Sequence, residues 1–150
     1  MKVRPFTPAD LEAVVRLWNQ TKRDTYTFIA VEQSRTVGED RAFFQERILE
    51  HTAIWVAERD ARIEGFLALR GSYLDRLYVR PDAQRRGVGA ALLLHAMALA
   101  PDGLELHTHQ RNTRARAFYE KHGLVPVRFG LSPPPECEPD VEYHWRPGRV

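Results

Sequence analysis

The sequence predicts one α/β domain built around a mixed β-sheet, and three observations support this fold class. Residues 53–79 contain three strand-like segments joined by short turns, which is the pattern of an antiparallel meander. The almost uninterrupted apolar segment 88–99 then predicts a helix that is buried on more than one side. From residue 104 onward, strand-like segments alternate with a helix-like one, so helices and strands are mixed along the chain.

The first third of the chain is expected to be mainly helical. Residues 3–6 predict a short strand, and Thr7 then begins a helix as a hydroxyl cap followed by proline. Residues 24–36 are ambiguous, with helix favoured although the segment is rich in threonine and aromatic residues. Residues 39–51 predict a further helix, so this region should cover one face of the sheet.

Seven strands are expected in all. They are residues 3–6, 53–57, 63–69, 74–79, 104–108, 125–129 and 141–145. An amphipathic helix is predicted at 112–122, with Gly123 as its terminator. The proline-rich segment 133–139 is too short for a domain linker and predicts a stiff surface loop. With no repeat in the sequence, a single domain is predicted over residues 1–150.

Composition narrows the class of protein. A net charge of +2 gives little support for a nucleic-acid partner, and no apolar run approaches the length of a membrane span. Cys137 is the only cysteine, and the N-terminus lacks the apolar stretch of a signal peptide, so a reducing cytoplasm is expected. The six histidines form no H-x-x-x-H pair or Cys-containing set, and no metal is expected.

The loop before the apolar helix is the first candidate site, and it reads Gln84-Arg85-Arg86-Gly87-Val88-Gly89-Ala90. A helix N-terminus offers unpaired amides and a partial positive charge, which suit a phosphate. The two glycines let the backbone approach phosphate oxygens closely, and the two arginines add charge-assisted hydrogen bonds. Alone, a Gly-x-Gly at a helix start is more often a structural turn. Neither the Walker pattern nor the G-x-G-x-x-G fingerprint is present.

Two motifs together resemble the GNAT superfamily of acyl-CoA-dependent N-acyltransferases. Gln84, Gly87 and Gly89 match the family's phosphate-loop motif Q/R-x-x-G-x-G/A. The segment from Asn112 to Leu124 is similar to the family's N-x-x-A-x-x-F-Y-x-x-x-G-F pattern, and it departs only in having Leu124 in place of phenylalanine. The likeness is close over residues 74–124 and extends elsewhere in the order of elements.

The resemblance implies a GNAT-type α/β (α+β) fold, with a mixed, mostly antiparallel seven-stranded sheet flanked by about four helices. It also implies a transferase that moves the acetyl group of acetyl-CoA directly to a primary amine. The cofactor-binding residues that it implies are Leu77, Val79, Gln84, Arg85, Arg86, Gly87, Val88, Gly89, Ala90 and Asn112. Tyr119 is implied as the general acid that protonates the departing thiolate.

Simpler roles stand beside these. Asn112 and Tyr119 lie seven residues apart, on one helix face, and without the resemblance they read as a helix cap and a core aromatic. The general base is open between His107, whose residue type has a suitable pKa near 6.5, Asp75 and an ordered water. Arg114 and Arg116 are about as well explained as surface arginines as by contact with the 3′-phosphate of CoA.

The acceptor is open at this stage: a small molecule and a peptide amine both fit the residues. The alternative function is a catalytically silent CoA-binding regulatory module, and a nucleic-acid-binding domain is disfavoured. A homodimer is conceivable, with the apolar segment 141–145 as its edge.

Overall fold

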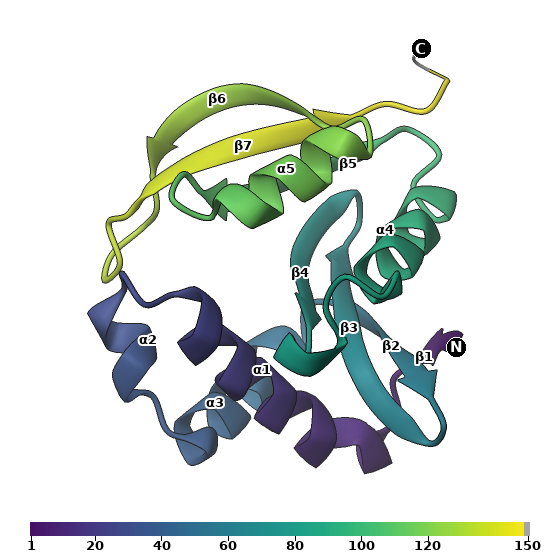
Figure 1. Ribbon diagram of the computed structural model, residues 1–150, viewed down its shortest axis with the longest axis vertical. Helices are drawn as coiled ribbons and strands as arrows, with labels where there is room; N and C mark the ends of the chain where they lie inside the picture. Colours follow the sequence, from purple (N-terminus) through teal and green to yellow (C-terminus); the bar gives the residue numbers. More distant parts are fainter. Residues whose placement is uncertain (149–150) are drawn as a thin grey trace.

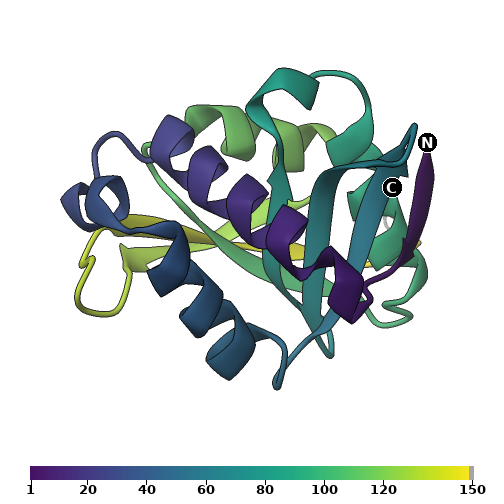
Figure 2. The same cartoon turned by 90° about the horizontal axis from the view of Figure 1, so that it is seen from below.

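The computed structural model describes residues 1–148, which form one seven-stranded sheet with helices on both faces (Figures 1 and 2). The strands are β1 (Lys2–Pro5), β2 (Ala53–Arg59), β3 (Arg62–Arg70), β4 (Tyr73–Val79), β5 (Leu104–His109), β6 (Val125–Leu131) and β7 (Pro139–Trp145). The helices are α1 (Leu11–Thr25), α2 (Ala30–Ser34), α3 (Val37–Phe43), α4 (Val88–Ala98) and α5 (Thr113–Lys121). The predicted fold class is confirmed, and all seven expected strands are present within a few residues of their predicted ends. Residues 149–150 of the predicted domain lie outside the described residues.

The part of the chain that the structure describes contains five α-helices, where about four were expected. The ambiguous segment 24–36 contains the last turn of α1 and the short helix α2. The predicted helix 39–51 is α3, which continues into a π-helical turn, η2 (Phe44–Ile48). Short 3-10 turns, η1 (Pro8–Asp10) and η3 (Pro81–Ala83), precede α1 and α4.

Helix α4 is buried on one face, so the prediction of burial on several sides is wrong. Its buried residues are Val88, Leu92, Leu93 and Ala96, which recur at helical spacing. Leu94, by contrast, is 57% exposed. The other outward positions are largely alanines, whose small apolar side chains do not require burial, and this misled the reading of the sequence.

The strand order is β1-β2-β3-β4-β5-β7-β6, which places β7 between two neighbours. The expectation that segment 141–145 could serve as a dimer edge is therefore wrong, because β7 pairs with both β5 and β6. The free edge at this end of the sheet belongs to β6. Its exposed apolar side chains include Phe129 and Leu131.

The last strand of the meander β2-β3-β4 contains a β-bulge near its start. Leu69 pairs with Leu74, while Ala68 pairs with Arg76, so Asp75 is an extra residue without a partner on β3. Beyond it, β4 and β5 separate. Among the described residues, these parallel strands pair at one position, Tyr73 with Glu105. The sheet consequently splits between β4 and β5 (Figure 1).

Two apolar cores lie on opposite faces of the sheet. One packs α4 and α5 against β3, β4, β5 and β7, with Leu92, Tyr119 and Tyr143 among its members. The other packs α1 and η2 against β2 and β3, with Trp18 and Phe44 at its centre. The sheet therefore separates two apolar cores, and the split between β4 and β5 lies between them.

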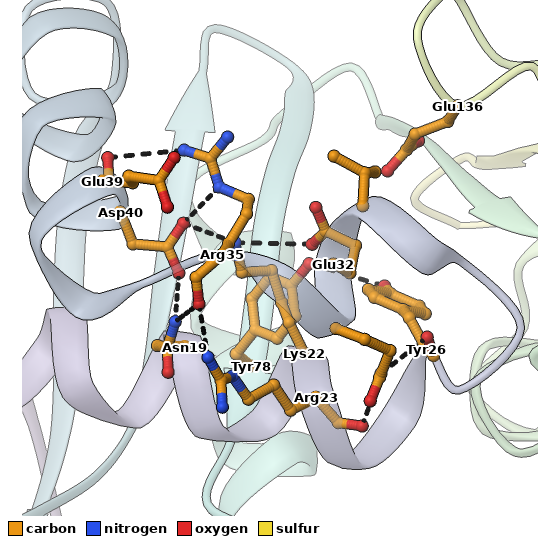
Figure 3. Close-up of polar contacts among 12 residues, drawn as sticks. Asn19, Lys22, Arg23, Tyr26, Glu32, Arg35, Glu39, Asp40, Tyr78 and Glu136 are labelled. Atoms are coloured by element: carbon orange, nitrogen blue, oxygen red, sulfur yellow. Dashed lines mark hydrogen bonds and ion pairs between the residues drawn. The ribbon is translucent and has the colours of Figure 1, made fainter.

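A buried ion network ties α1 to α2 and α3 (Figure 3). Asp40, whose side chain is fully buried, accepts hydrogen bonds from Lys22 Nζ at 2.8 Å and from Arg35 Nε at 2.7 Å. Asn19 Nδ2 donates to the same carboxylate at 2.9 Å, and Glu32 lies 3.4 Å from Lys22 Nζ. The network holds the C-terminal half of α1, which forms part of the cavity described below.

Removal of the buried anion should destabilise the fold. Asp40→Ala is expected to lower the free energy of unfolding by about 3–5 kcal/mol at neutral pH, because Lys22 loses its closest buried partner. Urea unfolding followed by circular dichroism measures the change. The matched variant Glu46→Ala removes an exposed acid from η2 and should change stability by no more than about 0.5 kcal/mol. Similar losses in the two variants would contradict a stabilising role for the network.

The same network predicts an acid dependence. Burial would raise the pKa of Asp40, but hydrogen bonds from Lys22, Arg35 and Asn19 outweigh it and hold the pKa below its ordinary value of 3.8. Its stabilising contribution is therefore present above that value and is lost as the pH falls through the lower pKa of the folded state. Asp40→Ala should lose this part of the acid sensitivity in unfolding measured down a pH series.

Candidate active site

A cavity of about 800 Å³ opens between the end of β4, the start of α4 and one face of α5. The C-terminal turns of α1 complete its wall. Of the predicted cofactor residues, those that line it are Leu77, Val79, Gln84, Arg85, Gly87, Gly89, Ala90 and Asn112. Tyr119 also lines the cavity, so both motifs found in the sequence meet in one place.

The start of α4 presents free backbone amides to this cavity. Gly87 is the N-cap residue, and its φ of 84° lies in the left-handed region that favours glycine. The first intrahelical bond runs from the Ala91 amide to the Gly87 carbonyl, which leaves the amides of Val88, Gly89 and Ala90 at the helix start unpaired. Val88 contributes only through its backbone, since its side chain is in the core.

The second glycine has a different role from the first. A Cβ on Gly89 would lie 3.4 Å from the Phe118 ring and 3.6 Å from Val79, which are ordinary van der Waals distances, so Gly89 marks where α4 packs against α5. A Cβ on Gly87 would meet nothing within 4 Å, so backbone conformation is what requires glycine there. The open space beside Gly87 suits a ligand that approaches the main chain closely.

The side chain of Gln84 links the loop before α4 to β4 and to α5 through two hydrogen bonds. Its Nε2 donates to the Val79 carbonyl at 3.0 Å, and its Oε1 accepts from Arg114 Nη2 at 2.9 Å. Arg85 lines the cavity beside it, whereas Arg86 is exposed and lies outside the cavity lining. Arg85 and Arg114 contribute positive charge to the cavity beside Gln84, and Arg111 and Lys121 also line it.

The backbone of β4 turns polar groups into the split. The Arg80 amide donates to the Glu64 carbonyl at 2.8 Å, which marks a hydrogen-bonded position of the β3–β4 ladder. Such positions alternate in an antiparallel pair, so the amides and carbonyls of Leu77 and Val79 point away from β3. The Val79 carbonyl agrees, since it accepts from the Gln84 side chain. The two amides face the side where β5 has diverged.

Helix α5 supplies the other wall. Asn112 is its N-cap, and its Oδ1 accepts from the Ala115 amide at 3.2 Å, so the capping role predicted for it is confirmed. Tyr119 lies on the same face and is 7% exposed. Burial raises the pKa of the Tyr119 phenol, and the phenols of Tyr78 and Tyr73 raise it further. The phenol therefore keeps its proton at neutral pH.

His107 lies on the opposite face of the sheet from α5. Leu104 and Leu106 pack into the core beneath α5, and the alternation of a strand turns His107 to the other side. The ring is exposed at the vertex of the split, two residues beyond Glu105. Its Nδ1 lies 2.9 Å from the Tyr73 hydroxyl. His107 is thus outside the cavity lining but at the place where β4 and β5 begin to separate.

The other candidates from the sequence are Asp75, Arg114 and Arg116, and only one of them lines the cavity. Asp75 occupies the bulge of β4, 3.9 Å from Arg76. Arg114 lines the cavity, but Arg116 turns away from it, with its Nε donating to the Tyr143 hydroxyl at 3.1 Å. Of the two arginines considered for a phosphate contact, the structure brings only Arg114 to the cavity.

The end of α1 is the part of the site that sequence reasoning missed. Thr21, Asp24 and Tyr26 line the cavity, and the Tyr26 hydroxyl lies 3.4 Å from that of Tyr78. Burial raises the pKa of both phenols. No local signal in the sequence marks these residues, because α1 meets the end of β4 only through tertiary packing.

Comparisons with known proteins agree with this geometry. The family model described as "Acetyltransferase (GNAT) domain" matches residues 50–125. Peptidyl-lysine N-acetyltransferase YjaB of Escherichia coli (strain K12) is 36% identical over 117 residues, covering 75% of this chain and 74% of that protein.

Solved structures show the same fold. The solution structure of apo YjaB from E. coli matches with a TM-score of 0.81 and 25% identity, covering 96% of each chain. The structure of YncA from Salmonella typhimurium, determined with its cofactor acetyl-CoA, matches with a TM-score of 0.75 and 14% identity, covering 100% of this chain and 95% of that one. On the matched domain, the shared sequence and the common fold, the chain belongs to the GNAT family and is an N-acetyltransferase.

Proposed function

We propose that this enzyme transfers the acetyl group of acetyl-CoA to the side-chain amine of a lysine in a protein or peptide. The observation that carries the proposal is the continuous cavity that runs from the free amides of α4 to the Tyr119 phenol. Two comparisons support it: YjaB bears the name of a peptidyl-lysine acetyltransferase, and YncA was solved with acetyl-CoA.

Residues at the two ends of the cavity fit different parts of the cofactor. The unpaired amides of Val88, Gly89 and Ala90 suit the pyrophosphate, and Arg85 adds positive charge. The Asn112 side chain, besides capping α5, faces the path that the pantetheine arm would follow. Arg86 is exposed and outside the cavity lining, so its proposed contact is limited to the outer, solvent-facing side of the phosphates.

The chemistry needs an oxyanion site, an acid and a base. The amides of Leu77 and Val79, which face the split, are the proposed donors to the carbonyl oxygen and to the amides of the cofactor. Tyr119, protonated at neutral pH, gives its proton to the leaving thiolate. His107 is the proposed base, taking a proton from the acceptor ammonium directly or through water at the vertex of the split. Asp75 is the second choice.

An acceptor screen separates catalysis from the silent CoA-binding alternative. Acetyl-CoA is incubated with lysine peptides, polyamines, aminoglycosides and free amino compounds, and thiol release is measured. Lysine peptides should give the highest kcat/KM. Release with a small amine alone would replace the proposed acceptor class, and CoA binding without release in any mixture would favour the silent module.

Location and partners stay predictions. Within residues 1–148, no helix is both long enough and apolar enough to cross a bilayer. Four expectations from the sequence stay predictions. They are a cytoplasmic location, no nucleic-acid or membrane partner, a single domain and a possible homodimer.

Loss of the proposed acid should slow turnover. Tyr119→Phe is expected to lower kcat by about 10²–10⁴-fold while leaving the affinity for acetyl-CoA nearly unchanged, because only the transferable proton is removed. Calorimetric binding and thiol-release kinetics measure the two quantities. Tyr143→Phe is the matched control, since that buried phenol faces Glu120 and should keep full activity. Full activity of Tyr119→Phe would reject the role.

Loss of the proposed base should lower the rate of acetyl transfer, and added imidazole should restore part of it. His107→Ala is expected to lower kcat by about 10²-fold or more, because the acceptor ammonium loses its proton acceptor. Added imidazole should restore part of the rate with saturation kinetics. A variant that keeps its rate would remove His107 from the mechanism and leave Asp75 or water as the base.

The two arginines of α5 make a matched pair for the 3′-phosphate. Arg114→Ala should weaken the binding of CoA about tenfold, as expected for loss of one charge-assisted hydrogen bond, but change dephospho-CoA little. Arg116→Ala should affect neither ligand. Calorimetry with both ligands measures this, and equal weakening of CoA and dephospho-CoA by Arg114→Ala would place its contact elsewhere.

A further inference from the structure

Two Glu-x-His segments lie side by side on neighbouring strands. One is Glu105-Leu106-His107 on β5, and the other is Glu142-Tyr143-His144 on β7, which runs antiparallel to it (Figure 1). Glu105 pairs with His144, and His107 pairs with Glu142. Each glutamate is therefore opposite the histidine of the other strand. The intervening Leu106 and Tyr143 are buried in the core under α5, so the four polar side chains share the opposite face of the sheet.

The functional atoms of these side chains converge. Ligand atoms of Glu105, Glu142 and His144 all lie within 4.8 Å of one another. His144 Nε2 is 2.6 Å from Glu142 Oε2, and His107 Nε2 is 3.6 Å from Glu142 Oε1. Both histidines thus direct the same ring nitrogen toward one carboxylate. Glu105, Glu142 and His144 are partly buried, whereas His107 is exposed.

We propose that Glu105, Glu142 and His144, with His107 as a fourth ligand, bind a divalent transition-metal ion such as Zn²⁺. Imidazole nitrogen and carboxylate oxygen are ligands that Zn²⁺ accepts in tetrahedral sites. Atoms no further apart than 4.8 Å share a centre within about 2.8 Å of each, and Zn²⁺ binds such atoms at about 2.0–2.2 Å. Small side-chain rotations close that difference for these three residues. His107 lies outside this group of three, with its Nε2 3.6 Å from Glu142 Oε1, and would join by moving toward the same centre.

A feature outside the ligand set supports the proposal. The Tyr73 hydroxyl, on β4, holds His107 Nδ1 at 2.9 Å, which turns Nε2 toward Glu142. Metal-binding histidines commonly have their second ring nitrogen held in this way. The two carboxylates also favour a cation, and the guanidinium of Arg128 has its Nη1 3.7 Å from Glu142. Arg128 is largely exposed and can swing into solvent when a metal ion binds.

Metal binding has a consequence for the reaction, and this consequence rests on the proposed function. A metal ion on His107 Nε2 occupies the electron pair that would take the acceptor's proton. Zn²⁺ should therefore inhibit acetyl transfer, and a chelator should restore it. The binding itself requires only the four side chains and is independent of the enzyme's acceptor.

The test uses the full chain and Zn²⁺ itself. Isothermal titration calorimetry should show one ion bound per chain in the wild type. The double variant Glu105→Gln/His144→Gln should weaken binding at least about tenfold, since two of the ligands are lost. The matched control Glu50→Gln/His51→Gln alters an exposed Glu–His pair in another part of the chain and should bind as the wild type does. Circular dichroism checks that each variant is folded, and Glu105→Gln alone serves if the double variant is not.

The outcomes separate the site from the function. Binding that is absent in the wild type, or equal in the wild type and the Glu105/His144 variant, overturns the proposal. Histidine NMR supports it if Nε2 of His144 and His107 shift on titration with Zn²⁺, and overturns it if neither does. If Zn²⁺ binds but the metal-free enzyme acetylates no lysine peptide, the metal site stands and the proposed acceptor fails.

Discussion

The single pairing of Tyr73 with Glu105 is the constraint on which the site depends. Parallel strands that stayed paired would satisfy each other's backbone groups and close the sheet. Here β4 and β5 separate after one position, so the amides of Leu77 and Val79 are left facing a gap. The gap is lined by α5 on one face and is open to His107 on the other. In the proposed function, this one interruption of the sheet would serve both as the path of the cofactor and as the entry of the acceptor.

The cofactor side could be predicted from sequence because its determinants are local. A glycine at positive φ before an apolar helix is visible in the sequence, and Gly87 adopts that conformation. Asn112 and Tyr119 share a helix face through spacing alone, and both line the cavity. The same local logic overestimated the burial of α4, since an alanine-rich outer face resembles a core in composition while tolerating solvent.

The side of the split proposed for the acceptor is formed by strands that are distant in the sequence. Their order in the sheet could not be predicted from local sequence patterns. The apolar residues of β7 did not indicate its position in the sheet. The strand lies between β5 and β6 and not at an edge. The same placement brings Glu142 beside His107 across a register that no local pattern specifies. Tyr26 likewise reaches the cavity through tertiary packing, because the buried ion network around Lys22 and the apolar core under α1 together fix that helix.

The extra residue in β4 has an evolutionary consequence. Leu74 and Leu77 both pack into the core beneath α4 and α5, although they are three positions apart, because Asp75 reverses the alternation of the strand. Position 75 has no partner on β3, but its presence sets the register of the strand. Its deletion would turn every later residue of β4 to the wrong face. Descendants of this sequence should therefore conserve the length of the strand that contains residue 75.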